Sequence, residues 1–240
     1  MPNAIRGGIL LLALLGNALA QRPHTPFVER VVTPERSRQL KVALNQKLWI
    51  LYDLPQCQLY QAWSGGTAGG KLITAEYTFF DQAAHFPHWF SAEGTQYFKE
   101  DVGEYFASWT KPADIDTYYT KWPIHPRNYK AWVVFNGTQT AGSETRYKGY
   151  SVNGDAFKLS FTLMLAGGGE ITINEVPEYL AAGAKTSLVR KFTFAGIPVG
   201  YSARLNLPVG GNWVVTGSGS KQGSTMVQTS DGQSTLTGSW

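Results

Sequence analysis

Hydrophobic and polar residues alternate along much of the chain with the two-residue period of a β-strand. The clearest run covers 157–165, where Phe157, Leu159 and Phe161 are separated by single polar residues. This alternation predicts a strand with one buried face and one face in water. Residues 39–44 alternate in the same way. Other runs predict strands at 48–52, 59–63, 72–80, 131–135, 146–152, 170–176, 188–194, 201–207, 225–230 and 233–238.

Turn-forming residues separate these runs. Asn153-Gly154 precedes the clearest strand, and the glycines 167–169 follow it. Asp231-Gly232 lies between the last two runs and predicts a type I′ hairpin, with Thr229 opposite Ser234. Short strands joined by such turns are typical of antiparallel sheets. We therefore expect an all-β, antiparallel two-sheet sandwich, forming a single domain over residues 21–240.

Residues 81–130 interrupt the strand pattern and hold twelve of the 32 aromatic residues. Within this insertion, apolar residues between Phe98 and Trp109 recur with helical spacing, which predicts a short amphipathic helix. A long excursion in a compact β domain is usually functional or disordered, and this one is too aromatic for disorder. The insertion is therefore the first place to expect a ligand.

The first twenty residues have the pattern of a signal peptide. Arg6 is followed by an apolar stretch over 9–15, and Ala18-Leu19-Ala20 fits the small-x-small cleavage pattern. Cleavage after Ala20 would place the mature protein in the periplasm or outside the cell. The apolar stretch is too short to span a bilayer, and no later stretch is suitable, so no membrane span is expected.

Composition narrows the classes of function. Charged residues make up only 16% of the chain, which excludes a coiled coil, an acidic disordered tail and a highly charged nucleic-acid binder. The net charge of +4 is spread without a Lys/Arg run, so no nucleic-acid partner is expected. Cys57 is the only cysteine and cannot form an internal disulfide. An exported domain without disulfides is typical of the bacterial envelope.

Five segments carry a family resemblance: RPHTPF (22–27), VALNQKLWILYDLPQCQLYQAWSGG (42–66), YKGYSV (147–152), ITINEVPEYL (171–180) and SLVRKFTFAGIP (187–198). Together they resemble an accessory β domain of exported bacterial proteins, and the similarity covers most of 22–205. In that family the domain often accompanies a c-type cytochrome domain, a PQQ-dependent sugar-dehydrogenase-like propeller, or both. The resemblance therefore implies an accessory role and suggests a redox or cytochrome protein as a partner.

This chain departs from the family pattern in two respects. It has neither the haem motif nor a propeller, so the resemblance implies no redox chemistry and no cofactor for this chain. Its 81–130 segment is also longer than the family's usual loop. The family offers no catalytic residues to transfer, so candidate chemistry must be sought in the residues themselves.

Metal and catalytic patterns in the sequence are weak. The candidate metal ligands are His85 and His88, together with His24, His125 and Asp81. Pro87 prevents a regular helix between the first two, so their spacing does not show that they lie on one face. No metal is therefore expected. Gly-x-Ser-x-Gly, Walker and dinucleotide motifs do not occur. Carboxylates that could pair for glycoside hydrolysis are Asp53, Glu76, Asp101, Glu104, Asp114, Asp116 and Glu175.

Aromatic residues with neighbouring acids give the best ligand hypothesis. Trp and Tyr rings pack against the apolar faces of sugars, while carboxylates orient the hydroxyl groups. The candidate ligand-binding residues are Trp89, Trp109, Tyr119, Trp122, Asp101 and Asp116. We therefore expect an exported, non-catalytic accessory domain that binds carbohydrate. The alternatives are a sugar-active enzyme (a glycoside hydrolase or mutarotase-like protein) that uses acids near the insertion, and a purely structural envelope domain whose rings close one end of the sandwich.

Two charged residues fall on faces that are otherwise apolar. Glu175 follows Ile171 and Ile173, and Arg190 follows Leu188, each at a spacing of two. An isolated buried charge is too costly to persist. If these two strands pair, Glu175 and Arg190 are expected to come close to opposite and to form a buried, structural ion pair.

Overall fold

The computed structural model describes residues 26–33, 36–45, 47–64, 66–68, 71–73, 76–78, 89–91, 95–99, 131–182, 185–208 and 210–240. Every regular element in these ranges is a β-strand, and every strand pair is antiparallel, which confirms the all-β, antiparallel prediction. The short helix was predicted between Phe98 and Trp109. Phe98 lies in a β-strand, and 100–109 lies outside the described residues, so the helix is not confirmed. The described part of the chain contains no helix with the length and apolar character needed to cross a membrane.

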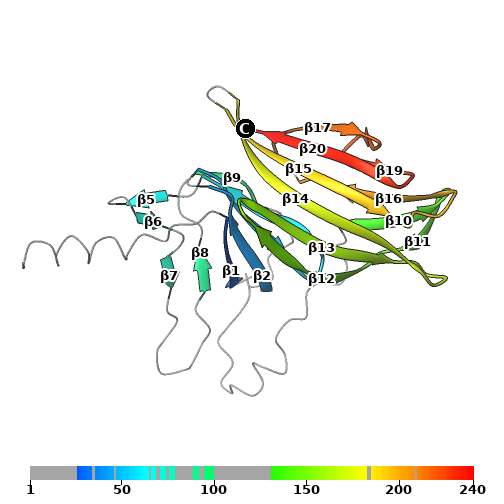
Figure 1. The fold of residues 1–240 in the computed structure, drawn as a ribbon, viewed down its shortest axis with the longest axis horizontal. Helices are drawn as coiled ribbons and strands as arrows, with labels where there is room; N and C mark the ends of the chain where they lie inside the picture. Colours follow the sequence, from blue (N-terminus) through cyan, green and yellow to red (C-terminus); the bar gives the residue numbers. More distant parts are fainter. Residues whose placement is uncertain are drawn as a thin grey trace, which may run out of the picture.

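The largest sheet has six strands in the order β12-β13-β14-β15-β20-β17 (Figure 1). The strands are β12 (Glu144–Asn153), β13 (Ala156–Met164), β14 (Glu170–Ala182), β15 (Lys185–Ala195), β20 (Gly232–Ser239) and β17 (Asn212–Gly217). β13 is the predicted alternating strand, and its four apolar residues from Phe157 to Leu163 are all buried. The Asn153-Gly154 turn joins it to β12 as predicted, with Asn153 paired to Ala156.

A second sheet, here called the β3 sheet, has the order β1-β2-β3-β4-β9. Its strands are β1 (Phe27–Thr33), β2 (Arg36–Ala43), β3 (Trp49–Asp53), β4 (Gln58–Trp63) and β9 (Gln96–Lys99). Every residue of β3 is buried, because both faces of the sheet are covered. On the outer face, a second apolar cluster includes Trp49, Tyr60 and Trp63, with the fully buried Lys41 paired to Glu29 at 2.6 Å.

A third sheet, here called the β10 sheet, has the order β11-β10-β16-β19-β18. Its strands are β11 (Gln139–Gly142), β10 (Trp132–Asn136), β16 (Tyr201–Asn206), β19 (Thr225–Gln228) and β18 (Ser220–Gln222). Two small antiparallel pairs complete the described fold: β5 (Gly66–Ala68) with β6 (Lys71–Ile73), and β7 (Glu76–Thr78) with β8 (Trp89–Ser91).

The β3 and β10 sheets share one hydrophobic core with the inner face of the six-stranded sheet. Tyr52 of the β3 sheet stacks on Phe157 of β13, with ring centroids 6.1 Å apart. Trp132 of the β10 sheet contacts Phe161 and Phe192 at 5.6 and 5.7 Å. Its indole N–H also donates to the Cys57 carbonyl at 3.3 Å, which ties the two smaller sheets together. Apart from the two small pairs, the strands are divided among three sheets, so the finer prediction of a two-sheet sandwich is not confirmed.

The predicted C-terminal hairpin is wrong, although both of its strands exist. β19 pairs with β16 and β18, whereas β20 pairs with β15 and β17, so the chain changes sheets between them. The Asp231 carboxylate accepts the Ile197 backbone N–H at 2.8 Å instead of closing a two-residue turn. Side chains still join the two strands, because the Ser234 hydroxyl donates to Gln228 Oε1 at 2.6 Å.

Candidate functional site

Most of the ligand-binding residues expected from the sequence lie outside the described part of the chain. This applies to Trp109, Tyr119, Trp122, Asp101 and Asp116, and also to the histidines and Asp81 considered as metal ligands. Trp89 begins β8, but its side chain is not described. Among the described residues, no group of three or more His, Cys, Asp or Glu side chains could hold a metal ion. The predicted insertion site therefore stays a prediction.

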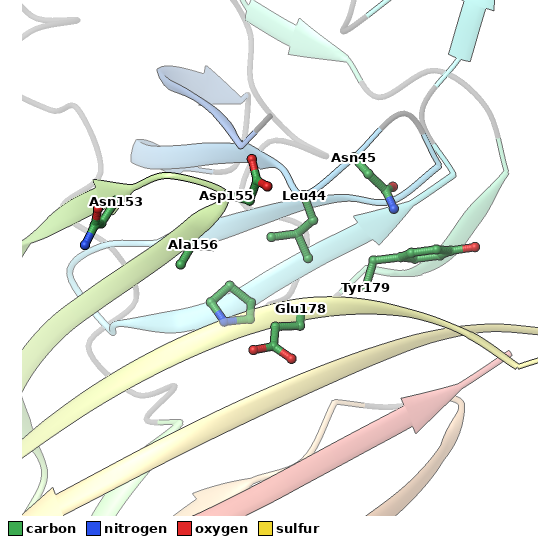
Figure 2. A pocket seen from close by; sticks show the side chains of 8 residues that line it. Leu44, Asn45, Asn153, Asp155, Ala156, Glu178 and Tyr179 are labelled. Carbon is green, nitrogen blue, oxygen red and sulfur yellow. The ribbon is translucent and has the colours of Figure 1, made fainter. Parts of the chain in front are cut away.

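The described residues form a different cleft, where the β3 sheet meets the six-stranded sheet. Its volume is about 500 Å³. Three parts of the chain surround it: the turn after β2, the β12–β13 turn and the second half of β14 (Figure 2). Its lining residues are Leu44, Asn45, Asn153, Asp155, Ala156, Pro177, Glu178 and Tyr179.

The cleft opens where β13 and β14 stop pairing. Their ladder runs from Met164↔Glu170 to Leu159↔Glu175 and ends there, although both strands continue. Pro177 comes two residues later and has no N–H to extend the ladder. The start of β13, at Ala156, therefore separates from β14 and leaves the space that the cleft occupies. A proline inside a strand pattern is the sequence signal that could have located this opening.

Asn45 is held on one side of the cleft by its own turn. Its Oδ1 accepts the backbone N–H groups of Lys47 and Leu48, both at 2.8 Å, in the manner of an Asx turn. Because the oxygen is engaged, the amide nitrogen is the group left to donate to a ligand. Figure 2 shows Asn45 on the same side of the cleft as the Tyr179 ring.

The β12–β13 turn supplies the opposite side. Gly154 has a φ of 57°, which the two-residue turn requires and which a side chain would strain. The turn presents Asn153 and Asp155, both exposed, at the mouth of the cleft. The rim therefore offers an amide and a carboxylate, which together can donate to and accept from hydroxyl groups.

β14 contributes side chains from both of its faces. Pro177 and Tyr179 share the inner face with Glu175, whereas Glu178 belongs to the outer face, because alternate residues point in opposite directions. Glu178 is exposed and pairs with Lys191 at 2.7 Å. In Figure 2 the carboxyl groups of Glu178 and Asp155 point away from one another. Leu44, Ala156 and Pro177 supply the apolar surface between these polar groups.

Just beyond the cleft, β14 is fixed to the β3 sheet by a buried triad of Tyr52, Glu175 and Arg190. Arg190 donates from Nε to Glu175 Oε1 at 2.6 Å and from Nη2 to Oε2 at 3.0 Å. The Tyr52 hydroxyl donates to Oε1 at 2.6 Å. All three residues are fully buried. Glu175 faces Phe192 and Arg190 faces Pro177 in the strand register, so the ion pair is diagonal and not directly opposite.

Burial explains the protonation state of this triad. Desolvation raises the pKa of the Tyr52 phenol well above its ordinary value, and the Glu175 charge raises it further. Burial lowers the pKa of Arg190, but the Glu175 carboxylate outweighs this effect, so the net change is upward. The triad therefore holds a neutral phenol and a closed ion pair. It positions β14, and sequence reasoning missed Tyr52 because nothing local marks its long-range partner.

Cys57 is not part of the cleft. It is buried, has an unusual φ of 46°, and its thiol donates to the Leu54 carbonyl at 3.1 Å. Burial raises the pKa of the thiol well above its ordinary value, and the charges of Asp53 and Glu175 add to this. A thiol held protonated in this way is a poor nucleophile.

No protein-family model matches the sequence, and neither the curated proteins nor the solved structures include a match.

Proposed function

We propose that this protein is an exported, non-catalytic carbohydrate-binding domain, and that the cleft between β14 and the two turns takes a sugar ring. One observation carries the proposal: the Tyr179 ring and an apolar floor lie beside amide and carboxylate groups in a single cleft. The volume of about 500 Å³ is within the range of small-molecule sites. The signal-peptide pattern of residues 1–20 supports export.

The chemistry of the lining matches that of a sugar. A pyranose has an apolar face that can lie against an aromatic ring, and hydroxyl groups that both donate and accept. Tyr179 with Leu44 and Pro177 offers the apolar contact. The Asn45 amide can donate to a hydroxyl group, and the Asn153 amide can both donate and accept. The only charged lining residues are Asp155 and Glu178, so a neutral sugar or an amino sugar fits better than an acidic one.

The same residues favour binding over hydrolysis. Glycosidases need two carboxyl groups on either side of one bond, roughly 5–9.5 Å apart and aimed at it. Here the Glu178 carboxylate is engaged by Lys191, and the Asp155 carboxylate points the other way (Figure 2). The aromatic residues of the insertion, with Trp109 and Trp122 foremost, remain proposed as further sugar contacts.

The direct test is binding of the purified protein to a panel of neutral polysaccharides: xyloglucan, mixed-linkage β-glucan, galactomannan, arabinoxylan and amylopectin. Retardation in native affinity gels is the readout. Tyr179→Ala should weaken binding at least tenfold. Tyr150→Ala is the matched control, because Tyr150 is a 43% exposed tyrosine of β12 outside the cleft lining, and it should bind as the native protein does.

The other outcomes separate the alternatives. Loss of binding in Trp109→Ala or Trp122→Ala with no change in Tyr179→Ala would move the site to the insertion. Release of reducing sugar from any of the polysaccharides would instead favour a sugar-active enzyme. Failure to bind the panel, together with a fall in melting temperature for Tyr179→Ala, would favour a structural envelope domain. Export is tested by sequencing the N-terminus of the protein recovered outside the cytoplasm, which should begin at Gln21.

A further inference from the structure

The β3 sheet and the six-stranded sheet also contact one another beyond the cleft, at Tyr97 and Thr186, and the line of contact between the two sheets is here called the seam. Thr186 lies opposite Ala181, two positions beyond Tyr179 on β14, which is about 7 Å along the strand. Tyr179 and Thr186 both belong to the inner face. In Figure 1 the C-terminus lies beside the adjoining ends of β14 and β15, so the end of β20 and these two strands meet at the same edge of the molecule.

Two aromatic rings meet at this end of the seam. The Tyr97 hydroxyl, from β9, donates to Thr186 Oγ1 at 3.1 Å. The Trp240 backbone N–H donates to the Thr186 carbonyl at 3.1 Å, and its ring stacks on Tyr97 with centroids 5.3 Å apart. Thr186 therefore joins both rings to β15, on which Leu188, two positions later, pairs with Tyr179 of β14.

The pair of rings is held rigidly from behind. Phe98 stacks on Trp240 at 5.6 Å, and Trp213 meets Trp240 edge-on at 5.6 Å. Phe98 and Trp213 are buried, whereas Tyr97 and Trp240 are only partly buried. The Trp213 indole N–H is itself fixed by the carbonyls of Pro208 and Gly210. A partly exposed ring pair on a fixed base loses little entropy when a ligand binds.

From this continuity we propose that Tyr97 and Trp240 form a second platform, so that the site takes a linear oligosaccharide and not a single sugar. The inference rests on the proposed function, because the first sugar would occupy the cleft at Tyr179. The next units would follow the seam to the ring pair.

The test is the dependence of affinity on chain length. Glucose, cellobiose, cellotriose and cellotetraose, with the corresponding mannose and xylose series, are titrated into the full protein by calorimetry. For a series that binds, affinity should rise at least tenfold between one and three units. Trp240→Ala should remove most of this rise and change monosaccharide affinity by less than twofold. Tyr97→Phe keeps the ring and loses only the bond to Thr186, so it should retain the rise.

Trp240→Phe keeps an aromatic ring and provides a second readout if the alanine variant is unstable. Trisaccharide should change the tryptophan fluorescence of the native protein more than that of Trp240→Phe. Equal affinity for one and three units would overturn the second platform and leave the proposed function standing. Equal loss at every length in Trp240→Ala would show that the pair only packs the fold, which also overturns it. Absence of binding in all series would overturn both proposals.

Discussion

Tyr52 donates its hydroxyl hydrogen to Glu175 at 2.6 Å, although the two residues are 123 positions apart in the chain. The bond crosses from the β3 sheet to the six-stranded sheet inside the core. The same carboxylate receives both bonds from Arg190, so a single side chain links three strands, β3, β14 and β15. Two positions farther along β14 lies Pro177, in the cleft lining. The triad therefore positions the part of β14 that lines the cleft.

Removing one partner of the buried ion pair should be costly. Arg190→Met leaves the Glu175 carboxylate buried without its counter-charge, and we expect the free energy of unfolding to fall by about 3–5 kcal/mol. Urea denaturation followed by circular dichroism measures this. A fall under about 1 kcal/mol, as for an exposed pair, would contradict the prediction.

The same two strands provide a matched control on the opposite face. Lys191 and Glu178 also lie 2.7 Å apart, but their side chains are 53% and 44% exposed. Lys191→Met should therefore change the free energy of unfolding by no more than about 1 kcal/mol. The double variant Glu175→Leu with Arg190→Met should cost less than the sum of the single changes, because it leaves no unpaired charge.

The buried phenol should make the protein sensitive to alkali. Burial raises the pKa of Tyr52 well above its ordinary value of 10.0. The unfolded chain therefore loses the Tyr52 proton first, and stability that is complete below about pH 10 declines as pH rises. In Tyr52→Phe this component is absent. Between pH 10 and 11.5, the free energy of unfolding of the native protein should fall by up to about 1.4 kcal/mol more per pH unit than that of the variant. Parallel slopes would contradict the prediction.

Asp231 should contribute to stability in the opposite pH range. Backbone N–H groups of Ile197 and Gly196 bind its carboxylate and lower its pKa below the ordinary value of 3.8. The contribution is therefore present above about pH 4 and is lost as pH falls through the lower folded-state value. Asp231→Asn should be less stable than the native protein at pH 7 and equally stable near pH 2. Melting temperatures of both proteins are measured from pH 7 to pH 2. A difference between them that stays constant over this range would contradict the prediction.

The features that sequence predicted are those determined within one or two neighbouring strands. The alternation of 157–165 identifies β13 and its buried face, because a strand's two faces follow directly from its residue order. The placement of Glu175 and Arg190 on apolar faces also follows from order alone. Tyr52, the third member, is not marked in this way, because its partner is brought close only by the packing of two sheets.

Turn-forming dipeptides predict hairpins less reliably than alternation predicts strands, because the same dipeptide is compatible with more than one backbone geometry. Asn153-Gly154 joins β12 and β13 as a hairpin. Asp231-Gly232 also accepts such a turn, yet here the chain leaves the β10 sheet and enters the six-stranded sheet. Whether β20 pairs with β19 or joins the other sheet depends on its competing partners β15 and β17. No local sequence pattern indicates these partners. The cleft was missed for a related reason, since it forms where β13 and β14 fail to pair.

The Trp213 ring, which supports Trp240 from behind, packs closely against Gly238. Gly238 on β20 lies opposite Trp213 on β17, and a Cβ at this position would stand 2.5–2.8 Å from three carbons of the Trp213 ring. The ring cannot shift easily, because its N–H is bound by two carbonyl groups, those of Pro208 and Gly210. Gly238→Ala should therefore lower the free energy of unfolding by about 1–3 kcal/mol.

Two further variants separate the clash from the general effect of replacing glycine. Gly167→Ala is the control, because no atom lies within 4 Å of a Cβ built there, and it should have little effect on urea denaturation. Adding Trp213→Phe to Gly238→Ala should recover part of the loss, since a smaller ring leaves room for the methyl group. If Gly238→Ala is as stable as Gly167→Ala, Trp213 moves freely. A mobile Trp213 would no longer fix Trp240 from behind, and the rigidity argued for the ring pair at the end of the seam would fail with it.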